Sequence, residues 1–338
     1  MTQDNTYHQP KLFINGREIL AKISGTLTFS GANSLNKLAV RINNDELQND
    51  SLYNKPVEFY LNNGSEDSAP MFRGYINNFN PSDKAISLSA TDVRSRITGN
   101  TGLKVTLTDD NNYDGYTLGQ FLFSYISEYF DSDDLSTDFL TDTNPKVFMT
   151  GERGDNLDVY QLVTTKIDEA INTDDYLNPL KHYVDIHEGT AQSSMVIRQE
   201  KSLTSDPQMY LSFEDGMSSY TYKRRLPPNT ILYKNRKFSY TNTPTGQINT
   251  QVTEQDSPAE TRELALRNIL VEQQYTDEIT VQVTKGMDIG LGSLVFLDVD
   301  REDIKGPHRV QSKVITFGDS CTCKLQLNKH APVLRDYI

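Results

Sequence analysis

The sequence predicts a mainly β protein with an α+β insert, in which two β modules flank an α/β segment. Apolar and polar residues alternate with a strand-like period at both ends of the chain, whereas the middle third changes to a helical period. The charge divides in the same way: residues 1–100 carry ten acidic and ten basic residues, 101–200 carry nineteen and six, and 201–338 carry seventeen of each. The whole formal charge of −13 therefore belongs to the middle third.

Composition limits the function classes. A chain of 338 residues can form two or three domains, each with its own core. The polar start and the lack of any run of about 18 apolar residues argue against a cleaved signal and a membrane span. Cys321 and Cys323 are too close along one strand for an easy mutual bridge, which favours a reducing compartment. A pI near 4.9 disfavours nonspecific nucleic-acid binding.

Residues 8–100 are predicted to form a first small barrel or sandwich. Asn15-Gly16 between two apolar runs indicates a two-residue hairpin, and Asn62-Asn63-Gly64 and Asn80 to Asp83 are further turn signals. The expected strands cover 12–14, 19–23, 26–29, 38–42, 57–61, 71–79 and 85–91.

Residues 101–205 are predicted to form an acidic α/β middle domain. Thr117 and Gln120 fit a capping box, and apolar residues follow at helical spacing as far as Phe130. A second helix is expected to start near Asp155 or Asn156 and to run to about Ile171. A solvated loop is expected at 131–134, and strands at 183–186 and 195–197.

Residues 206–330 are predicted to form a second barrel, followed by a C-terminal tail at 331–338. Ser257 and Pro258 supply the cap and first turn of a helix over 258–274, which is expected to pack on the middle domain. The last strand pair is expected to turn at Gly318-Asp319. The expected strands cover 209–213, 219–222, 230–233, 279–283, 294–299, 308–316 and 321–327.

Several runs of residues together resemble the central hub proteins of contractile phage tails and the related late-control and type VI spike proteins. In the third module these runs are Glu272 to Tyr275, Ile279 to Val283, Lys285 to Met287, Gly290 to Leu297 and the closing pair HRVQSKVITFGDSCTCKLQL. In the first module they are Val57 to Leu61, Met71 to Ile76 and Ile86 to Asp92.

The resemblance implies two tail-tube-like antiparallel β-barrels plus an α/β middle domain. It also implies a homotrimer whose six barrels adapt a sixfold tail tube to a threefold spike and line a channel for DNA, which passes without specific binding. The expected partners are a tail tube or tube-initiator protein, a central spike protein, baseplate wedge proteins and a tape measure protein. The expected location is the virion tail baseplate, assembled in the bacterial host cytoplasm without membrane insertion. Little sequence follows Leu327, so the spike is expected to be a separate protein.

No catalytic, cofactor-binding or metal-binding residue is predicted. Asp110 to Gly115 matches the opening of a calcium loop, but Phe121 occupies the twelfth position, where a glutamate is required. His182 and His187 should point to opposite faces of one strand, and Cys321 and Cys323 are expected to be core residues.

A basic hairpin and an enzyme remain alternatives. Lys223 to Arg225 and Lys234 to Lys237, with tyrosines between them, would suit a hairpin that touches phosphates, although charged strand residues are more often a solvated face. The alternative function is a tail-associated cell-wall hydrolase or carbohydrate-binding β protein, which would need a cleft with converging acids. The sequence contains no Gly-x-Ser-x-Gly, no His-Glu-x-x-His and no tryptophan for sugar stacking.

Overall fold

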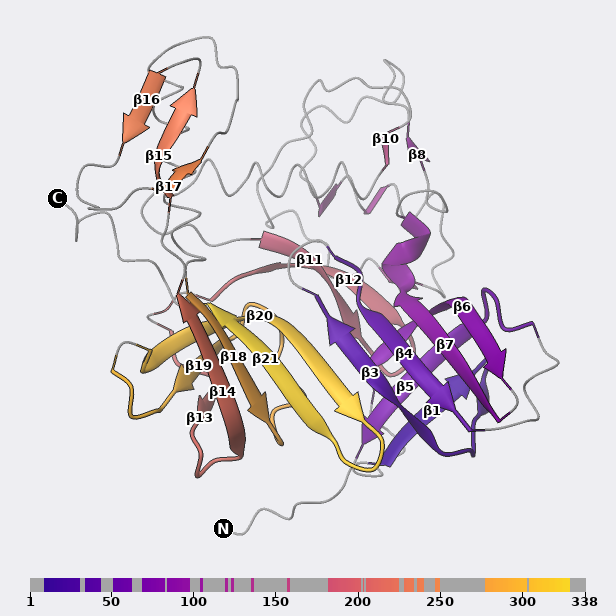
Figure 1. The fold of residues 1–338 in the computed structure, drawn as a ribbon. Coiled ribbons are helices and arrows are strands. Elements are labelled where there is room, and N and C mark those ends of the chain that lie inside the picture. Colours follow the sequence, from indigo (N-terminus) through magenta and orange to yellow (C-terminus); the bar gives the residue numbers. More distant parts are fainter. Residues whose placement is uncertain are drawn as a thin grey trace. The chain divides into compact units, whose positions relative to one another are not determined.

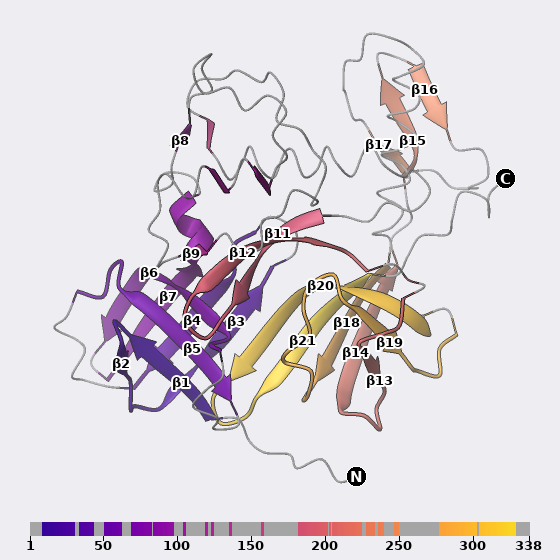
Figure 2. The ribbon, with the colours of Figure 1, turned by 180° about the vertical axis from the view of Figure 1, so that it is seen from behind.

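The structure is a computed structural model and consists mainly of antiparallel β-strands (Figures 1 and 2), as predicted. It divides into two compact units: a first unit of residues 1–170, 182–199 and 312–323, and a second unit of 171–181, 200–311 and 324–338. Among the described residues no helix is long and apolar enough to cross a membrane. The structure describes residues 9–30, 34–43, 51–62, 69–97 without 83, 104–105, 119–120, 123–124, 135–136, 157–158, 182–224 without 202 and 204, 228–233, 236–239, 247–249, and 277–328 without 303.

The first unit contains one large antiparallel sheet in the order β20-β3-β4-β7-β6-β5-β1-β2. A short 3₁₀ helix, η1 (Val93–Ile97), follows β7. The strands are β1 (Gln9–Ile14), β2 (Arg17–Glu18), β3 (Ile23–Phe29), β4 (Lys37–Ile42), β5 (Pro56–Asn62), β6 (Phe72–Ser82), β7 (Ala85–Asp92) and the C-terminal part of β20 (Gly306–Phe317).

Local sequence accounts for these strands. In β4, Leu38, Val40 and Ile42 are buried while the residues between them are exposed, as expected for a strand with one face on a core. The hairpin between β1 and β2 turns at Asn15 and Gly16, whose φ angles of 52° and 75° are those of a type I′ turn. The hairpin at Asn15-Gly16 and the strands expected at 12–14, 26–29, 38–42, 57–61, 71–79 and 85–91 are therefore confirmed. The strand expected at 19–23 is wrong, because β2 ends at Glu18 and β3 begins only at Ile23. The turn expected at Asn80 to Asp83 begins later, because β6 continues to Ser82, which pairs with Ala85.

The sheet of the first unit curls strongly. Phe59 on β5 and Phe317 on β20 belong to strands five places apart in the sheet order, yet their ring centroids lie 4.4 Å apart. Both rings are almost fully buried. A flat sheet would hold these strands more than 20 Å apart at roughly 4.8 Å per strand. No sheet closes into a complete ring within the described part of the chain, so the predicted barrels are not established as closed barrels.

Gly25 on β3 and Gly74 on β6 mark places where neighbouring strands approach closely. A Cβ atom on Gly25 would overlap the Ala39 carbonyl oxygen, and one on Gly74 would overlap the Thr91 carbonyl oxygen. We expect Gly25→Ala to lower the free energy of unfolding by about 2–3 kcal/mol, because backbone atoms must move. Urea denaturation followed by circular dichroism measures this. Gly290→Ala is the control, since its Cβ would meet only the Ser293 hydroxyl at 3.5 Å; equal losses for the two variants would contradict the expectation.

A smaller sheet of the first unit is built on the hairpin of β11 (His182–Glu188) and β12 (Ser193–Gln199), which confirms the strands expected at 183–186 and 195–197. β9 (Leu135–Ser136) adds to β12 in parallel, opposite Ser193 and Ser194. β8 (Lys104–Val105) and β10 (Leu157–Asp158) form a separate antiparallel pair.

One helix prediction needs correction. Leu157 and Asp158 lie in β10, where the sequence predicts the start of the second helix; pairing with Val105 and Lys104 decides their conformation instead of the helical spacing. Gly119–Gln120 and Phe123–Ser124 are helical, as expected for the first helix. The remainder of both helices, the loop at 131–134, the helix at 258–274 and the tail at 331–338 lie outside the described residues.

The second unit has a main sheet in the order β13-β19-β20-β21-β18-β14. Its two outer strands follow each other in sequence, and Met217 N–H donates to the Ser212 carbonyl at 3.0 Å in the turn between them. The strands are β13 (Met209–Leu211), β14 (Met217–Arg224), β18 (Asp277–Val283), β19 (Leu294–Leu297), β20 and β21 (Thr322–Asn328). A three-stranded sheet of β15 (Pro228–Tyr233), β16 (Arg236–Ser239) and β17 (Gln247–Asn249) is separate. The predicted strands of this module are confirmed, with β13 and β19 shorter than expected.

Candidate assembly surfaces

A buried ion pair organises the edge of the first unit where the main sheet meets the β11–β12 hairpin. Arg94 in η1 is 2% exposed, and its guanidinium donates to both carboxylate oxygens of Asp92, with Nη2 2.6 Å from Oδ2. The same guanidinium donates to the Val184 carbonyl at 2.7 Å and to the Ser34 carbonyl at 3.1 Å. Asp92 in turn accepts the backbone N–H of Asn36 at 2.7 Å. One ion pair therefore links β7, η1, the start of β4 and β11.

A second arginine binds the turn of the same hairpin. Arg73 on β6 donates from Nη1 to the Gly189 carbonyl at 2.6 Å and from Nη2 to the Thr190 carbonyl at 2.7 Å. Its Nε donates to Glu58 on the neighbouring strand at 2.7 Å. The guanidinium thus donates hydrogen bonds to two carbonyls of the hairpin turn and to one carboxylate. These charge-assisted bonds fix the turn between β11 and β12.

Glu188 completes this contact from the hairpin side. One carboxyl oxygen accepts the backbone N–H of Arg73 at 3.1 Å and the other accepts the Ser193 hydroxyl at 2.6 Å. Burial, opposed by these hydrogen bonds and by the Arg73 charge, raises the pKa of Glu188 to about 7. We call Arg73, Glu188 and Ser193, with the carbonyls of Gly189 and Thr190, the hairpin clasp.

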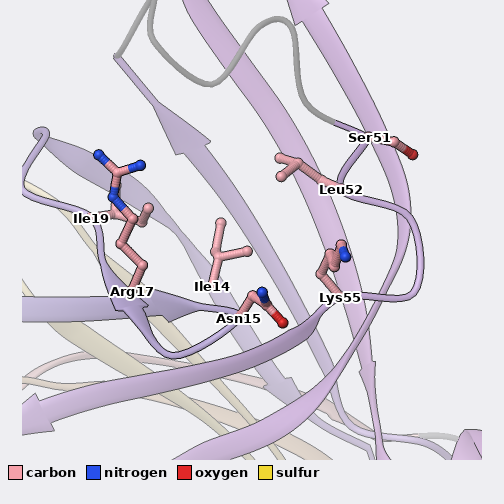
Figure 3. A pocket seen from close by; sticks show the side chains of 7 residues that line it. All are labelled: Ile14, Asn15, Arg17, Ile19, Ser51, Leu52 and Lys55. Carbon is pink, nitrogen blue, oxygen red and sulfur yellow. The ribbon is translucent and has the colours of Figure 1, made fainter.

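The first unit also has a small open cavity beside the β1–β2 hairpin (Figure 3). Its volume is about 380 Å³, and Ile14, Ile19 and Leu52 supply the apolar part of its lining while Arg17 and Lys55 supply positive charge. Leu20, which follows the lining residue Ile19 in sequence, is 89% exposed. Among the described residues, those that line this cavity include no acid and so supply no paired carboxylates of the kind that a glycosidase cleft needs.

The second unit presents an exposed aromatic cluster around β13. Tyr210 and Phe213 are 57% and 58% exposed. The Tyr210 ring lies 5.3 Å from that of Phe296 on β19, and the Phe213 ring lies 6.0 Å from that of Tyr220 on β14. Exposed aromatic rings next to an outer strand are typical of protein contact surfaces.

The second unit has its own buried charge contact. Arg309 on β20 donates to the Lys201 carbonyl at 2.7 Å and reaches Glu200 at 3.4 Å, while Gln311 donates to the other Glu200 oxygen at 3.2 Å. These bonds attach the chain that follows β12 to β20. The contact therefore has a structural role: it fixes the backbone at Glu200 and Lys201 against β20.

The structure brings together few of the candidates that the sequence singles out. His182 and His187 both lie in β11, but the side chain of His182 is outside the described part of the structure, so their predicted placement on opposite faces stays a prediction. Cys323 is buried and Cys321 partly so, and neither forms a disulfide. The described residues contain no group of three or more side chains that could hold a metal ion. The calcium-like run 110–115 lies outside the described residues.

The two basic runs are only partly described. Lys223 and Arg224 end β14, and β15 and β16 form a hairpin in which Tyr233 pairs with Arg236. Arg225, Lys234 and Asn235 lie outside the described residues. The two runs do not share one hairpin, because β14 pairs with β18 in the main sheet whereas β15 and β16 belong to the separate sheet. Contact of either run with phosphates stays a prediction.

Sequence reasoning missed Arg73, Arg94 and Glu188. The available signal was a charged residue directly after an apolar one, as in Phe72-Arg73 and Val93-Arg94. A charge at such a position is buried only with a partner. Asp92 lies two residues from Arg94, but the hairpin carbonyls that both arginines bind are 90 to 117 residues away, and no spacing rule identifies them.

Comparison with known proteins identifies the fold through structure alone, since no protein-family model and no curated protein sequence matches the chain. A tail protein from Neisseria meningitidis superposes with a TM-score of 0.66 at 13% identity, covering 98% of this chain and 99% of that one. A 43 kDa tail protein of prophage MuSo2 from Shewanella oneidensis gives 0.63 at 11% identity, covering 96% and 100%. This chain has the fold of phage tail proteins.

A type VI secretion component extends the likeness. The Escherichia coli protein, described as structurally similar to two tail proteins of bacteriophage T4, gives a TM-score of 0.58 at 8% identity and covers 95% of this chain and 78% of its own. The resemblance to phage-tail and type VI hub proteins that the sequence indicates is thus confirmed. At such low identities the likeness concerns the fold.

Proposed function

We propose that this chain is the structural hub of a phage-tail baseplate. Three copies would form a ring that adapts the sixfold tail tube to the threefold spike and lines the channel through which DNA passes without specific binding. The observation that carries the proposal is the near-complete mutual coverage with the Neisseria tail protein, 98% of one chain and 99% of the other. A match of that extent involves both β units and the residues between them, as a match to one isolated module would not.

The proposal includes a domain division. Residues 8–100 and 206–330 would be the two tail-tube-like barrels, residues 101–205 the acidic α/β middle domain, and residues 331–338 a tail. The curled sheet of the first unit, with Phe59 against Phe317, supports a barrel-like module there. The two compact units into which the chain divides support a chain with two separate cores.

A ring would be stabilised by pairing between the outer strands of neighbouring sheets. β2 ends the described main sheet of the first unit, while β13 and β14 end that of the second. Outer strands expose backbone groups that promote association, and a ring satisfies them by pairing each unit with its neighbour. The aromatic cluster at Tyr210 and Phe213 suits such a contact. The tube or tube-initiator protein, the central spike protein, wedge proteins and the tape measure protein would occupy the remaining faces of this virion component.

Mass and symmetry test the proposal. We expect sedimentation equilibrium of the purified chain, from micromolar concentrations upward, to give a trimer of 38.3 kDa chains. Electron microscopy of the ring should resolve six β units around one axis, because each chain contributes two. Superposition of residues 10–100 on 205–240 plus 275–330 in that map tests the twin barrels.

Two results would count against the hub. A chain that stays monomeric at high concentration and occupies no threefold position in isolated tails is not a ring subunit. Clearance of a peptidoglycan suspension in a turbidity assay would favour the hydrolase alternative instead. A trimer without such clearance supports the proposal.

A further inference from the structure

The described residues on either side of an acidic segment, in η1 and β11, are joined by a hydrogen bond. Residues 98–181 contain sixteen acidic and five basic residues, so they carry −11 of the net charge of −13. The segment begins after η1 and ends before β11. Arg94 in η1 donates to the Val184 carbonyl in β11 at 2.7 Å and so bridges the two flanks. β9, which belongs to the segment, pairs with β12. The β11–β12 hairpin is therefore bonded to η1 through β11 and to β9 through β12.

The hairpin clasp holds the turn of the same β11–β12 hairpin. The β6–β7 ladder ends where Gly74 pairs with Asp92, and the chain then turns into η1. The backbone N–H of Arg73 lies one residue beyond this end, and Glu188 accepts it in place of a strand partner. The Ser193 hydroxyl binds the same carboxyl group at the residue that pairs with Leu135 of β9. Glu188 thus joins β6 of the main sheet to the residue of β12 that pairs with β9.

We propose that the hairpin clasp is a proton-sensitive contact, with Glu188 as its proton-binding residue, that holds the β11–β12 hairpin on β6 of the main sheet more firmly as the pH falls. Arg94 also holds the hairpin, through the Val184 carbonyl, and its charge is balanced by Asp92. The clasp differs because its carboxyl group is 13% exposed and lies 3.8 Å from the nearest guanidinium nitrogen of Arg73. Glu58 takes the short contact to Arg73 instead, at 2.7 Å.

The charged groups around Glu188 set the sign. Arg73 on β6 and the Ser193 hydroxyl on β12 favour the carboxylate, whereas burial and the charge of Asp92 on β7 favour the neutral acid, and burial prevails. The pKa of Glu188 is therefore raised in the docked hairpin, to about 7 from the usual 4.5. The docked state binds the extra proton, so docking is strongest below about pH 4.5 and weakens as the pH rises toward and through 7.

Hydrogen exchange measures the opening of the hairpin directly. Amide exchange of residues 182–199 is followed by mass spectrometry at pH 5, 6, 7 and 8 in the full-length protein and corrected for the intrinsic exchange rate. We expect the corrected opening equilibrium to rise roughly 50- to 100-fold from pH 5 to pH 8. Peptides from β3 and β4 are the internal reference and should change much less.

Two variants isolate the residue responsible. Glu188→Gln keeps an acceptor for the Arg73 N–H but cannot ionise, so it should abolish the pH dependence and keep the hairpin docked at pH 8. Asp185→Asn is the matched control, because Asp185 lies on the same strand in a contact with the 44% exposed Arg198, and it should leave the dependence unchanged. An identical pH dependence in β3 and β4 peptides, a flat wild-type profile, or a dependence that persists in Glu188→Gln would each overturn the proposal. None of these results depends on trimer formation.

Discussion

Replacement of Arg94 by alanine is expected to lower the free energy of unfolding of the first unit by about 3–5 kcal/mol, as is typical when one partner of a buried ion pair is removed. The variant leaves the Asp92 carboxylate buried without its counterion. It also leaves the carbonyls of Val184 and Ser34 without their donor. Urea denaturation followed by circular dichroism measures the loss, and hydrogen exchange should show the largest change in β11.

Two further variants test the cause. Arg94→Lys should recover only part of the loss, because an ammonium group cannot reproduce the forked contact with Asp92 together with bonds to two carbonyls. Arg198→Ala removes an ion pair with Asp185 that is more exposed than the Arg94–Asp92 pair. It should lower the free energy of unfolding by at most about 1 kcal/mol. Similar losses for Arg94→Ala and Arg198→Ala would show that burial of the pair has no special effect.

The strands of this fold could be predicted from the sequence because their signals are local. The alternation in Leu38, Val40 and Ile42 and the turn at Asn15-Gly16 each depend on residues within a few positions of one another. The closing hairpin of β20 and β21 is equally local, with Gly318 at a φ of 154° in its turn. Such features follow from side-chain period and backbone sterics alone.

The arrangement of those strands could not be predicted in the same way. β3 lies between β20 and β4, so a strand near the start of the chain pairs with one nearly 290 residues later. Leu157 and Asp158 show the opposite failure: their spacing favours a helix, yet they pair with Val105 and Lys104. In the first case the local strand preference is correct and only the partner is unpredictable, whereas at Leu157 and Asp158 pairing overrides the local preference.

The candidate surfaces were harder to predict than the fold. Asp92 and Arg94 are two residues apart, and their pairing is visible as a possibility in the sequence. The hydrogen bond from Arg94 to the Val184 carbonyl on β11 is not visible in the sequence, because it depends on where the chain returns after residues 98–181. The clasp at Glu188 likewise requires Arg73 to lie beyond the end of the β6–β7 ladder, which is a property of the folded sheet.

The contact between Phe59 and Phe317 offers the strongest test of the curled sheet. Phe59→Ala should lower the free energy of unfolding by about 3–5 kcal/mol, since a fully buried ring is replaced by a cavity. Phe29→Ala should cost clearly less, because the Phe29 ring is only partly buried and lies against the Lys313 ammonium at 4.3 Å. Urea denaturation of both variants gives the comparison.

A double-mutant cycle separates the contact from the general loss of burial. Phe59→Leu, Phe317→Leu and the double variant keep most of the apolar volume and remove the pair of rings. If the sheet brings β5 over β20, the two substitutions should couple by about 0.5–1.5 kcal/mol, the range measured for contacting aromatic pairs. Strictly additive losses would mean that the rings do not touch in solution, and the sheet would then be flatter than the barrel-like module requires. Because the two strands are 258 residues apart in sequence at these positions, coupling here can arise only through the folded sheet.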